Sequence, residues 1–106
     1  MSILAKSAVV ALALALVPVA NAAAAPRVQD ECNSYFCFRL VGDANSWTAI
    51  IIKTSSELTN IGIEGPRGQG GSSRGDILKV SGSGGGAVSG IGFQGFKQKG
   101  FISFTI

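Results

Sequence analysis

Hydrophobic and polar positions alternate in short blocks through the chain after residue 34, and turn-forming residues separate these blocks. The pattern predicts six short strands, at residues 35–41, 47–54, 58–64, 77–80, 87–96 and 101–106. In the last strand Ile102, Phe104 and Ile106 share one face, whereas the middle of the second strand is apolar on both faces, as in a strand buried within a sheet. We therefore expect an all-β fold, a small antiparallel β-sandwich or barrel.

The predicted core depends on the register chosen for each strand, because a shift of one residue exchanges its two faces. With the register that we favour, the core contains Phe38, Leu40, Ile50, Ile52, Ile61, Ile63, Leu78, Val80, Ile91, Phe93, Ile102 and Phe104. Gly90, Gly92 and Gly95 interrupt the fifth predicted strand. Glycine inside a strand leaves room for another backbone or a bulky side chain, or marks a bulge.

Two stretches rich in glycine are predicted to be loops. Residues 65–75 contain five glycines with Pro, Ser, Gln and two arginines, and residues 81–86 read Ser-Gly-Ser-Gly-Gly-Gly. Neither stretch has the side-chain pattern of a regular element.

The first 22 residues have the pattern of a cleavable signal peptide: a short cationic start, an apolar run over residues 8–17 and a small-residue exit. We predict cleavage after Ala22, with Ala24 and Ala25 as alternatives. Residues 23–34 are then an irregular N-terminal segment, and residues 35–106 form the small β domain.

A membrane anchor is the alternative for this leader, because no charged residue lies between Lys6 and Arg27. Pro18, Asn21 and the many alanines lower its hydrophobicity and favour cleavage. No later segment is apolar and long enough to span a bilayer. The expected product is therefore secreted and extracellular, with no membrane contact once the signal is removed.

Cys32 and Cys37 are the only cysteines and both follow the leader. An oxidising compartment favours a disulfide between them, which would pin residues 23–34 to the first strand. The closed ring is small and contributes only about 2 kcal/mol. Two thiolates without histidine cannot complete a tetrahedral zinc site, so we predict no metal and no cofactor.

The absence of histidine from the chain excludes Ser-His and Cys-His catalysis. A small hydrolase would have to use carboxylates such as Glu57, Glu64 and Asp76, and most of the six acidic residues lie beside predicted turns. We therefore expect a protein that is not an enzyme. The net charge of +3 comes from scattered basic residues, so no nucleic acid is expected as a partner.

Several residues are candidates for contact with an extracellular protein or glycan. Arg67 and Arg74 could bind a phosphate, a sulfate or an acidic polysaccharide. Residues 74–76 read Arg-Gly-Asp, the tripeptide bound by adhesion receptors of the integrin type, although Gly75 and Asp76 are also ordinary turn residues.

The aromatic residues Trp47 and Tyr35 are the other candidates, because aromatic faces stack on sugars. Their alternative role is packing in or beside the core.

The Arg74–Ile77 segment, with its RGD tripeptide, and the run to Phe101–Phe104 are loosely similar to small secreted effectors of plant-associated fungi. In particular they resemble a host-selective toxin family whose compact β-sandwich carries RGD on a loop. In that family disulfides join distant parts of the chain, whereas Cys32 and Cys37 are close in sequence. The resemblance implies an interaction with a host partner.

Together these features predict a small secreted interaction protein, non-enzymatic and effector-like, that acts through exposed loops on an extracellular or host partner. The alternative is a secreted carbohydrate- or cell-wall-binding module with Trp47 and Tyr35 as its platform.

Overall fold

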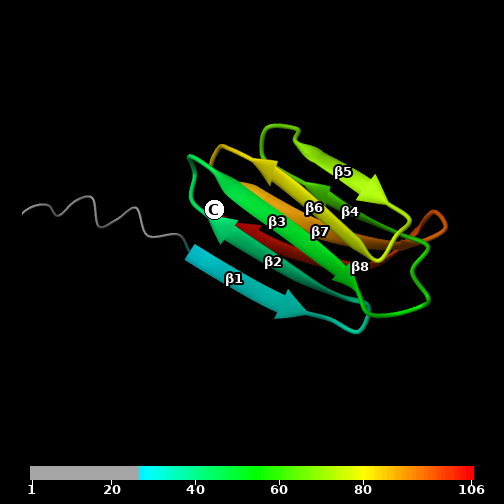
Figure 1. Cartoon of the computed structure of the whole chain (residues 1–106). Coiled ribbons are helices and arrows are strands. Elements are labelled where there is room, and N and C mark those ends of the chain that lie inside the picture. The colour runs from blue at the N-terminus through cyan, green and yellow to red at the C-terminus, as the bar shows by residue number, and fades with distance from the viewer. Residues whose placement is uncertain (1–26) are drawn as a thin grey trace, which may run out of the picture.

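The computed structural model describes residues 27–106, which form two antiparallel β-sheets packed face to face (Figure 1). The predicted signal peptide, residues 1–22, lies outside the described residues. The strands are β1 (Arg27–Cys32), β2 (Phe36–Gly42), β3 (Trp47–Lys53), β4 (Asn60–Glu64), β5 (Gly70–Ser73), β6 (Ile77–Gly82), β7 (Ala87–Gln94) and β8 (Lys97–Thr105). The expected all-β sandwich is confirmed.

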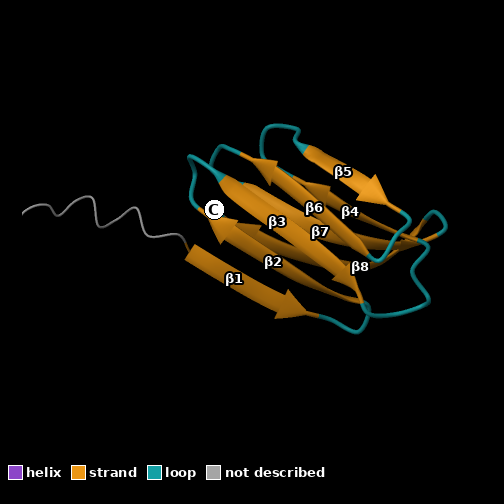
Figure 2. Ribbon diagram, viewed as in Figure 1, coloured by secondary structure: helices purple, strands orange, loops and turns teal. Residues whose placement is uncertain are grey.

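One sheet has the order β1-β2-β3-β6 and the other has the order β5-β4-β7-β8. The chain crosses between the sheets in the connections β3–β4, β5–β6 and β6–β7, and only turns and loops join the strands (Figure 2). Residues 27–106 contain no helix, and hence none that is long and apolar enough to cross a membrane.

The structure has eight strands, where the sequence pattern predicted six. One additional strand, β1, lies in the segment predicted to be irregular, and the other, β5, lies in the loop predicted at residues 65–75. Both are edge strands with little apolar side-chain pattern. Backbone pairing with β2 and β4 holds them instead, so both predictions are wrong at these positions.

Within residues 27–106 the core contains eleven buried hydrophobic residues: Phe36, Phe38, Leu40, Trp47, Ala49, Ile51, Leu58, Ile61, Ile63, Val88 and Ile102. The predicted register of β3 is wrong by one residue. Ile51 is fully buried, whereas its neighbour Ile52 is 44% exposed and Ile50 also lies on the outer face. In β7 the buried positions are Val88, Ser89, Gly90 and Gly92, so Ile91 and Phe93 are not core residues either.

The glycines of β7 make space for large side chains, as expected from the sequence. A Cβ atom at Gly90 would lie 2.8 Å from the ring of Phe38, and one at Gly92 would lie 2.8 Å from Leu58. The ladder between β7 and β8 is also irregular between Gly92 and Phe93. Glycine therefore lets the two sheets approach where Phe38 and Leu58 fill the core.

The first and last strands meet at one edge of the sandwich. Arg27 Nη2 donates a hydrogen bond to the carbonyl oxygen of Thr105 at 2.9 Å, and Gln29 Nε2 donates to the same oxygen at 3.2 Å. These bonds link β1 in one sheet to β8 in the other.

Candidate functional site

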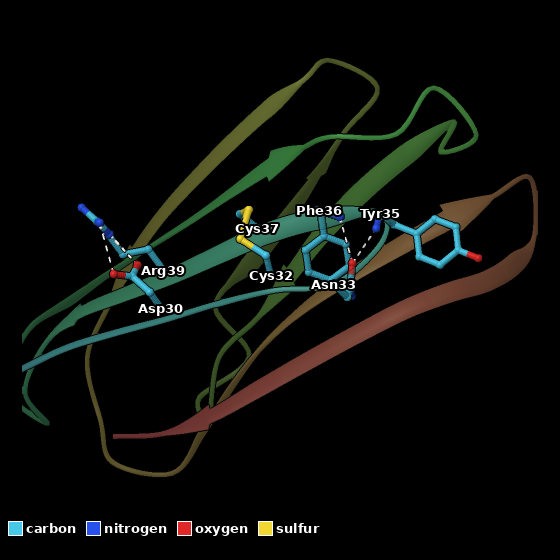
Figure 3. The surroundings of a disulfide bond; sticks show 7 residues. All are labelled: Asp30, Cys32, Asn33, Tyr35, Phe36, Cys37 and Arg39. Carbon is cyan, nitrogen blue, oxygen red and sulfur yellow. Dashed lines mark hydrogen bonds and ion pairs between the residues drawn. A yellow bond between two sulfur atoms is a disulfide. The ribbon is translucent and has the colours of Figure 1, made fainter.

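The predicted disulfide is present and joins facing residues of the β1–β2 hairpin (Figure 3). The Cα atoms of Cys32 and Cys37 are 4.0 Å apart. The tight turn forms because Asn33 Oδ1 accepts hydrogen bonds from the backbone N–H groups of Tyr35 (2.8 Å) and Phe36 (2.9 Å). The cross-link therefore fixes β1 to β2 locally and does not connect the two sheets.

A surface ion pair lies on the same hairpin. Arg39 Nε is 2.6 Å from Asp30 Oδ1, and Arg39 Nη2 donates a second bond to Oδ2 at 3.2 Å. The hydrogen bond with Asp30 and its negative charge raise the pKa of Arg39 above the ordinary arginine value. The guanidinium therefore stays charged, and Asp30 has a cationic neighbour on the adjacent strand.

The structure separates the two candidate arginines. Because β5 runs antiparallel to β4, the residues before β5 and those after it lie at opposite ends of the sandwich. Arg67 lies before β5, close to Gly84 in the β6–β7 connection, and Arg74 lies after β5. They cannot act together on one small anion, because a strand of four residues lies between them.

Trp47 cannot serve as a stacking platform, because only 1% of its surface is exposed. Its indole is packed at the end of the core against Gly65 and Gly82, where a Cβ atom would come within 2.8 Å and 2.5 Å of the ring. The prediction of Trp47 as a ligand contact is wrong. Its indole Nε1 has no hydrogen-bond partner within residues 27–106, so packing alone holds it there.

Tyr35 lies in the β1–β2 turn, half-buried, with its ring directed away from the disulfide (Figure 3). Its carbonyl oxygen accepts hydrogen bonds from the N–H groups of Thr54 and Ser55, at 2.9 Å and 3.1 Å. Lys99 Nζ is 5.9 Å from the ring centroid, a distance at which cation–π attraction operates. Tyr35 thus remains available at the end of the sandwich that carries Arg74, but its ring already has a cationic neighbour.

The Arg-Gly-Asp tripeptide is the exposed connection between β5 and β6. Gly75 N–H donates to Ser73 Oγ at 2.9 Å, and the Asp76 carbonyl oxygen accepts from the N–H of Lys53 at 2.7 Å. The Asp76 carboxylate also lies 3.5 Å from Lys53 Nζ. The tripeptide is therefore a turn held against the end of β3, and its carboxylate already has a partner in the same chain.

A groove with a cavity volume of about 1050 Å³ opens beside this turn. It lies at the end of the sandwich that carries the β3–β4, β5–β6 and β7–β8 connections, on the right in Figure 1. Its lining residues come from four strands and these connections: Lys53, Leu58, Thr59, Asn60, Ser72, Ser73, Arg74, Phe93, Gly95 and Phe96. A volume at the upper end of the range for ligand sites, open to solvent, suits an extended partner such as an oligosaccharide or a peptide segment.

The lining combines cations, hydroxyl and amide groups, and aromatic rings. Lys53 and Arg74 supply positive charge, and no aspartate or glutamate of the described part of the chain lines the groove. Lys53 is shared with Asp76 and the Leu58 carbonyl oxygen, whereas Arg74 forms no ion pair with any of residues 27–106. Phe96 is fully exposed at its rim. This arrangement can bind an acidic group at Arg74 and pack an apolar or sugar-ring surface on Phe96.

The local structure that shapes this groove begins with Thr59. Its hydroxyl accepts a hydrogen bond from Gly95 N–H at 2.8 Å and lies 3.3 Å from the Phe93 carbonyl oxygen. Gly95 takes a φ of 62°, which glycine adopts without strain. The β3–β4 connection therefore holds the β7–β8 turn in place and fixes where Phe96 emerges.

The three acidic residues considered for hydrolysis do not converge. Glu64 pairs with Gly70 at the Arg67 end of the sandwich, whereas Glu57 and Asp76 are exposed at the other end. Within residues 27–106, no group of three or more potential metal ligands exists. The groove thus offers binding groups without facing carboxylates.

Sequence reasoning identified Arg74 but missed the rest of the groove. Thr59, Asn60 and Phe96 come from predicted turns and strand ends, and only the strand pairing brings them near Ser72 and Ser73. The sequence pattern placed Phe96 at the end of the strand predicted at residues 87–96, whereas in the structure β7 ends at Gln94 and Phe96 lies in the turn before β8.

Comparison with known protein families, with characterised proteins and with solved structures finds no match to this chain.

Proposed function

We propose that this chain is a small secreted interaction protein, non-enzymatic and effector-like, whose groove binds an acidic extracellular or host partner. The observation that carries the proposal is the groove lining, in which Arg74 and Lys53 supply positive charge and Arg74 has no ion-pair partner among residues 27–106. An exposed arginine beside hydroxyl and amide groups suits carboxylate or sulfate groups of a partner. The Cys32–Cys37 disulfide supports an oxidising compartment.

Binding of acidic and neutral probes tests this function. An oligogalacturonate, a heparin oligosaccharide and a neutral glucan of similar length, each measured by isothermal titration calorimetry, separate charge recognition from sugar recognition. We expect the acidic probes to bind and their affinity to fall as salt is raised, because salt screens exposed charges. Equal affinity for the neutral glucan at all salt concentrations would overturn the proposal.

Arg67 provides a matched control for Arg74, since both are exposed arginines in loops, at opposite ends of the sandwich. A hydrogen bond to a charged group contributes roughly 1.5–3 kcal/mol, so Arg74→Gln should weaken binding of the acidic probe about 10-fold or more. Arg67→Gln should leave it unchanged. A loss that is equal in both variants would show that only the overall charge matters and that the groove is not the site.

A carbohydrate- or cell-wall-binding module is the second candidate, and the exposed ring of Phe96 favours it. With Trp47 buried, Phe96 at the groove rim takes over the role of stacking platform. Retention on an insoluble neutral polysaccharide that is lost in Phe96→Ala but kept in Arg74→Gln would favour this candidate. No retention on any polysaccharide would remove it.

Secretion itself is tested by mass spectrometry of the culture medium. We expect a product that starts after Ala22, Ala24 or Ala25, with a mass two hydrogens below that of the reduced chain. The intact chain in the cytosol, with both thiols free, would contradict the proposal.

A further inference from the structure

The outward-facing side of the sheet β1-β2-β3-β6 carries an apolar row that crosses all four strands. The strand register places Ile77, Ile52, Cys37 and Cys32 side by side in that order. Ile77 is 61% exposed and Ile52 is 44% exposed, so nothing within residues 27–106 covers them. A hollow of about 420 Å³ lies next to the disulfide, lined by Ile50, Ile52, Phe38 and the two cysteines together with Asp30, Glu31 and Arg39.

The neighbouring row on the same face lies two residues further along each strand, and it is charged at its two ends. It runs Lys79, Ile50, Arg39 and Asp30, again one residue from each strand. Arg39 is engaged with Asp30 through two hydrogen bonds. Lys79 is exposed on the edge strand β6 and forms no ion pair with any of residues 27–106. A positive charge therefore lies at one edge of the face and a carboxylate at the other.

We propose that a second copy of this chain covers this face. The two copies are related by a two-fold axis that lies in the interface, between the β1-β2-β3-β6 sheet of one subunit and the same sheet of the other, and runs parallel to the strands. That rotation exchanges the β1 edge with the β6 edge and leaves each row opposite itself. Lys79 then faces Asp30 of the partner subunit, and Ile77 faces the partner's Cys32. Each apolar row closes over the other, and two ion pairs form at the edges.

The charged row also decides between the two possible two-fold axes. An axis perpendicular to the strands would keep each strand opposite its own copy, so Lys79 would face β6 of the partner subunit, where no outward position is a carboxylate. Where that axis passes through the charged row, Lys79 would face the partner's Lys79 and Asp30 the partner's Asp30. Like charges that face each other oppose association. Of these two axes, the one parallel to the strands is the one that places Lys79 opposite the partner's Asp30. This inference does not depend on the proposed function, because the groove lies elsewhere, at the end of the sandwich.

The size of the face predicts a weak dimer. Four strands about 4.8 Å apart, each presenting six residues of about 3.3 Å, give a flat area of roughly 400 Å² per subunit. Stable interfaces bury about 800 Å² per partner. We therefore expect a weak, reversible dimer, which only a concentration series reveals.

Sedimentation velocity of the purified wild-type protein, from about 10 µM to about 1 mM, tests for the association expected of a weak interface. We expect a shift from monomer to dimer across this range. Ile77→Asp should abolish the shift. Phe101→Asp is the matched control, since Phe101 is 53% exposed on the outward side of the other sheet, and this variant should dimerise as wild type does. Near-ultraviolet circular dichroism of Trp47 checks that each variant is folded.

A charge swap tests the axis itself. Lys79→Asp and Asp30→Lys should each weaken the dimer at least 5-fold, because each places like charges opposite one another. The double variant D30K/K79D restores opposite charges and should recover most of the wild-type association. Recovery requires that the two positions meet across the interface. If either substitution acted only by disturbing the fold, the double variant would not recover association.

Three results would overturn the proposal. One is a monomer at every concentration. Another is a dimer that Phe101→Asp abolishes and Ile77→Asp leaves intact. The third is a double charge variant that associates no better than its parents. If the wild-type protein is monomeric and hydrogen exchange at β6 slows only when residues 1–26 are retained, the occupant of the face is that segment and not a second copy.

Discussion

Gly82 lies directly against the indole of Trp47: a Cβ atom on this glycine would be 2.5 Å from Cζ2 of the ring. The buried tryptophan at the end of the core therefore depends on a position without a side chain. Gly65, in the β4–β5 connection, provides a similar clearance, because a Cβ atom there would lie 2.8 Å from the same ring.

We predict that Gly82→Ala destabilises the protein by about 1–3 kcal/mol, the usual cost of overpacking a filled core. Urea unfolding followed by Trp47 fluorescence measures the change. Gly71→Ala is the control, because its nearest neighbour, Val80 Cγ2, would be 3.7 Å away, an ordinary contact. The two variants behaving alike would show that Trp47 does not pack as described.

The register of β3 is testable with two adjacent isoleucines. Ile51→Ala should lower the free energy of unfolding by about 2–5 kcal/mol, because it empties a buried site. Ile52→Ala should cost less than about 1 kcal/mol, because that side chain faces outward. Measurement at low protein concentration keeps self-association out of the comparison. A larger effect for Ile52 would restore the register first expected from the sequence.

The disulfide should have a modest and local effect. Replacing Cys32 and Cys37 together by serine should lower stability by about 2 kcal/mol, as expected for so short a loop. Amide hydrogen exchange should become faster in β1, while β4 and β7 keep their protection. Binding of an acidic probe to the groove should not change, because the disulfide does not line it. Global loss of the fold on reduction would contradict this prediction.

Asp76 should have little role in cell adhesion, but its charge should affect how tightly the groove binds an acidic probe. Asp76→Glu should leave integrin-dependent cell attachment unchanged, because the tripeptide is a turn held by Lys53. Asp76→Asn removes the carboxylate that lies 3.5 Å from Lys53 Nζ and should raise affinity for an acidic probe about 2- to 5-fold, the low end for an exposed ion pair. Loss of attachment in Asp76→Glu would show that the tripeptide is functional.

The fold class could be predicted because β2, β4 and β8 carry apolar residues at every second position. In β3 the run Trp47-Thr-Ala-Ile-Ile-Ile52 is apolar on both faces, and hydrophobicity alone does not choose between them. Residue size decided the outcome, since Trp47 needs the space that Gly65 and Gly82 leave. The local hydrophobic pattern does not show such a fit, because it depends on residues far apart in the sequence.

The edge strands and the site were harder to predict for a related reason. β5 reads Gly-Gly-Ser-Ser, so its pairing with β4 depends on backbone groups that every residue carries. Missing β5 also placed Arg67 and Arg74 in one loop, whereas they lie at opposite ends. The disulfide was predictable because Cys32 and Cys37 left no other choice of pairing.

The hydrogen bond from Arg27 to the Thr105 carbonyl oxygen has a practical consequence for work with this protein. It brings the start of β1 and the end of β8 together at the end of the sandwich remote from the groove. A fluorescent protein, an affinity handle or a phage coat protein attached at residue 106 would thus leave the groove open. A permuted chain that joins residues 106 and 27 through a short linker and begins at Ser56 should keep the same fold.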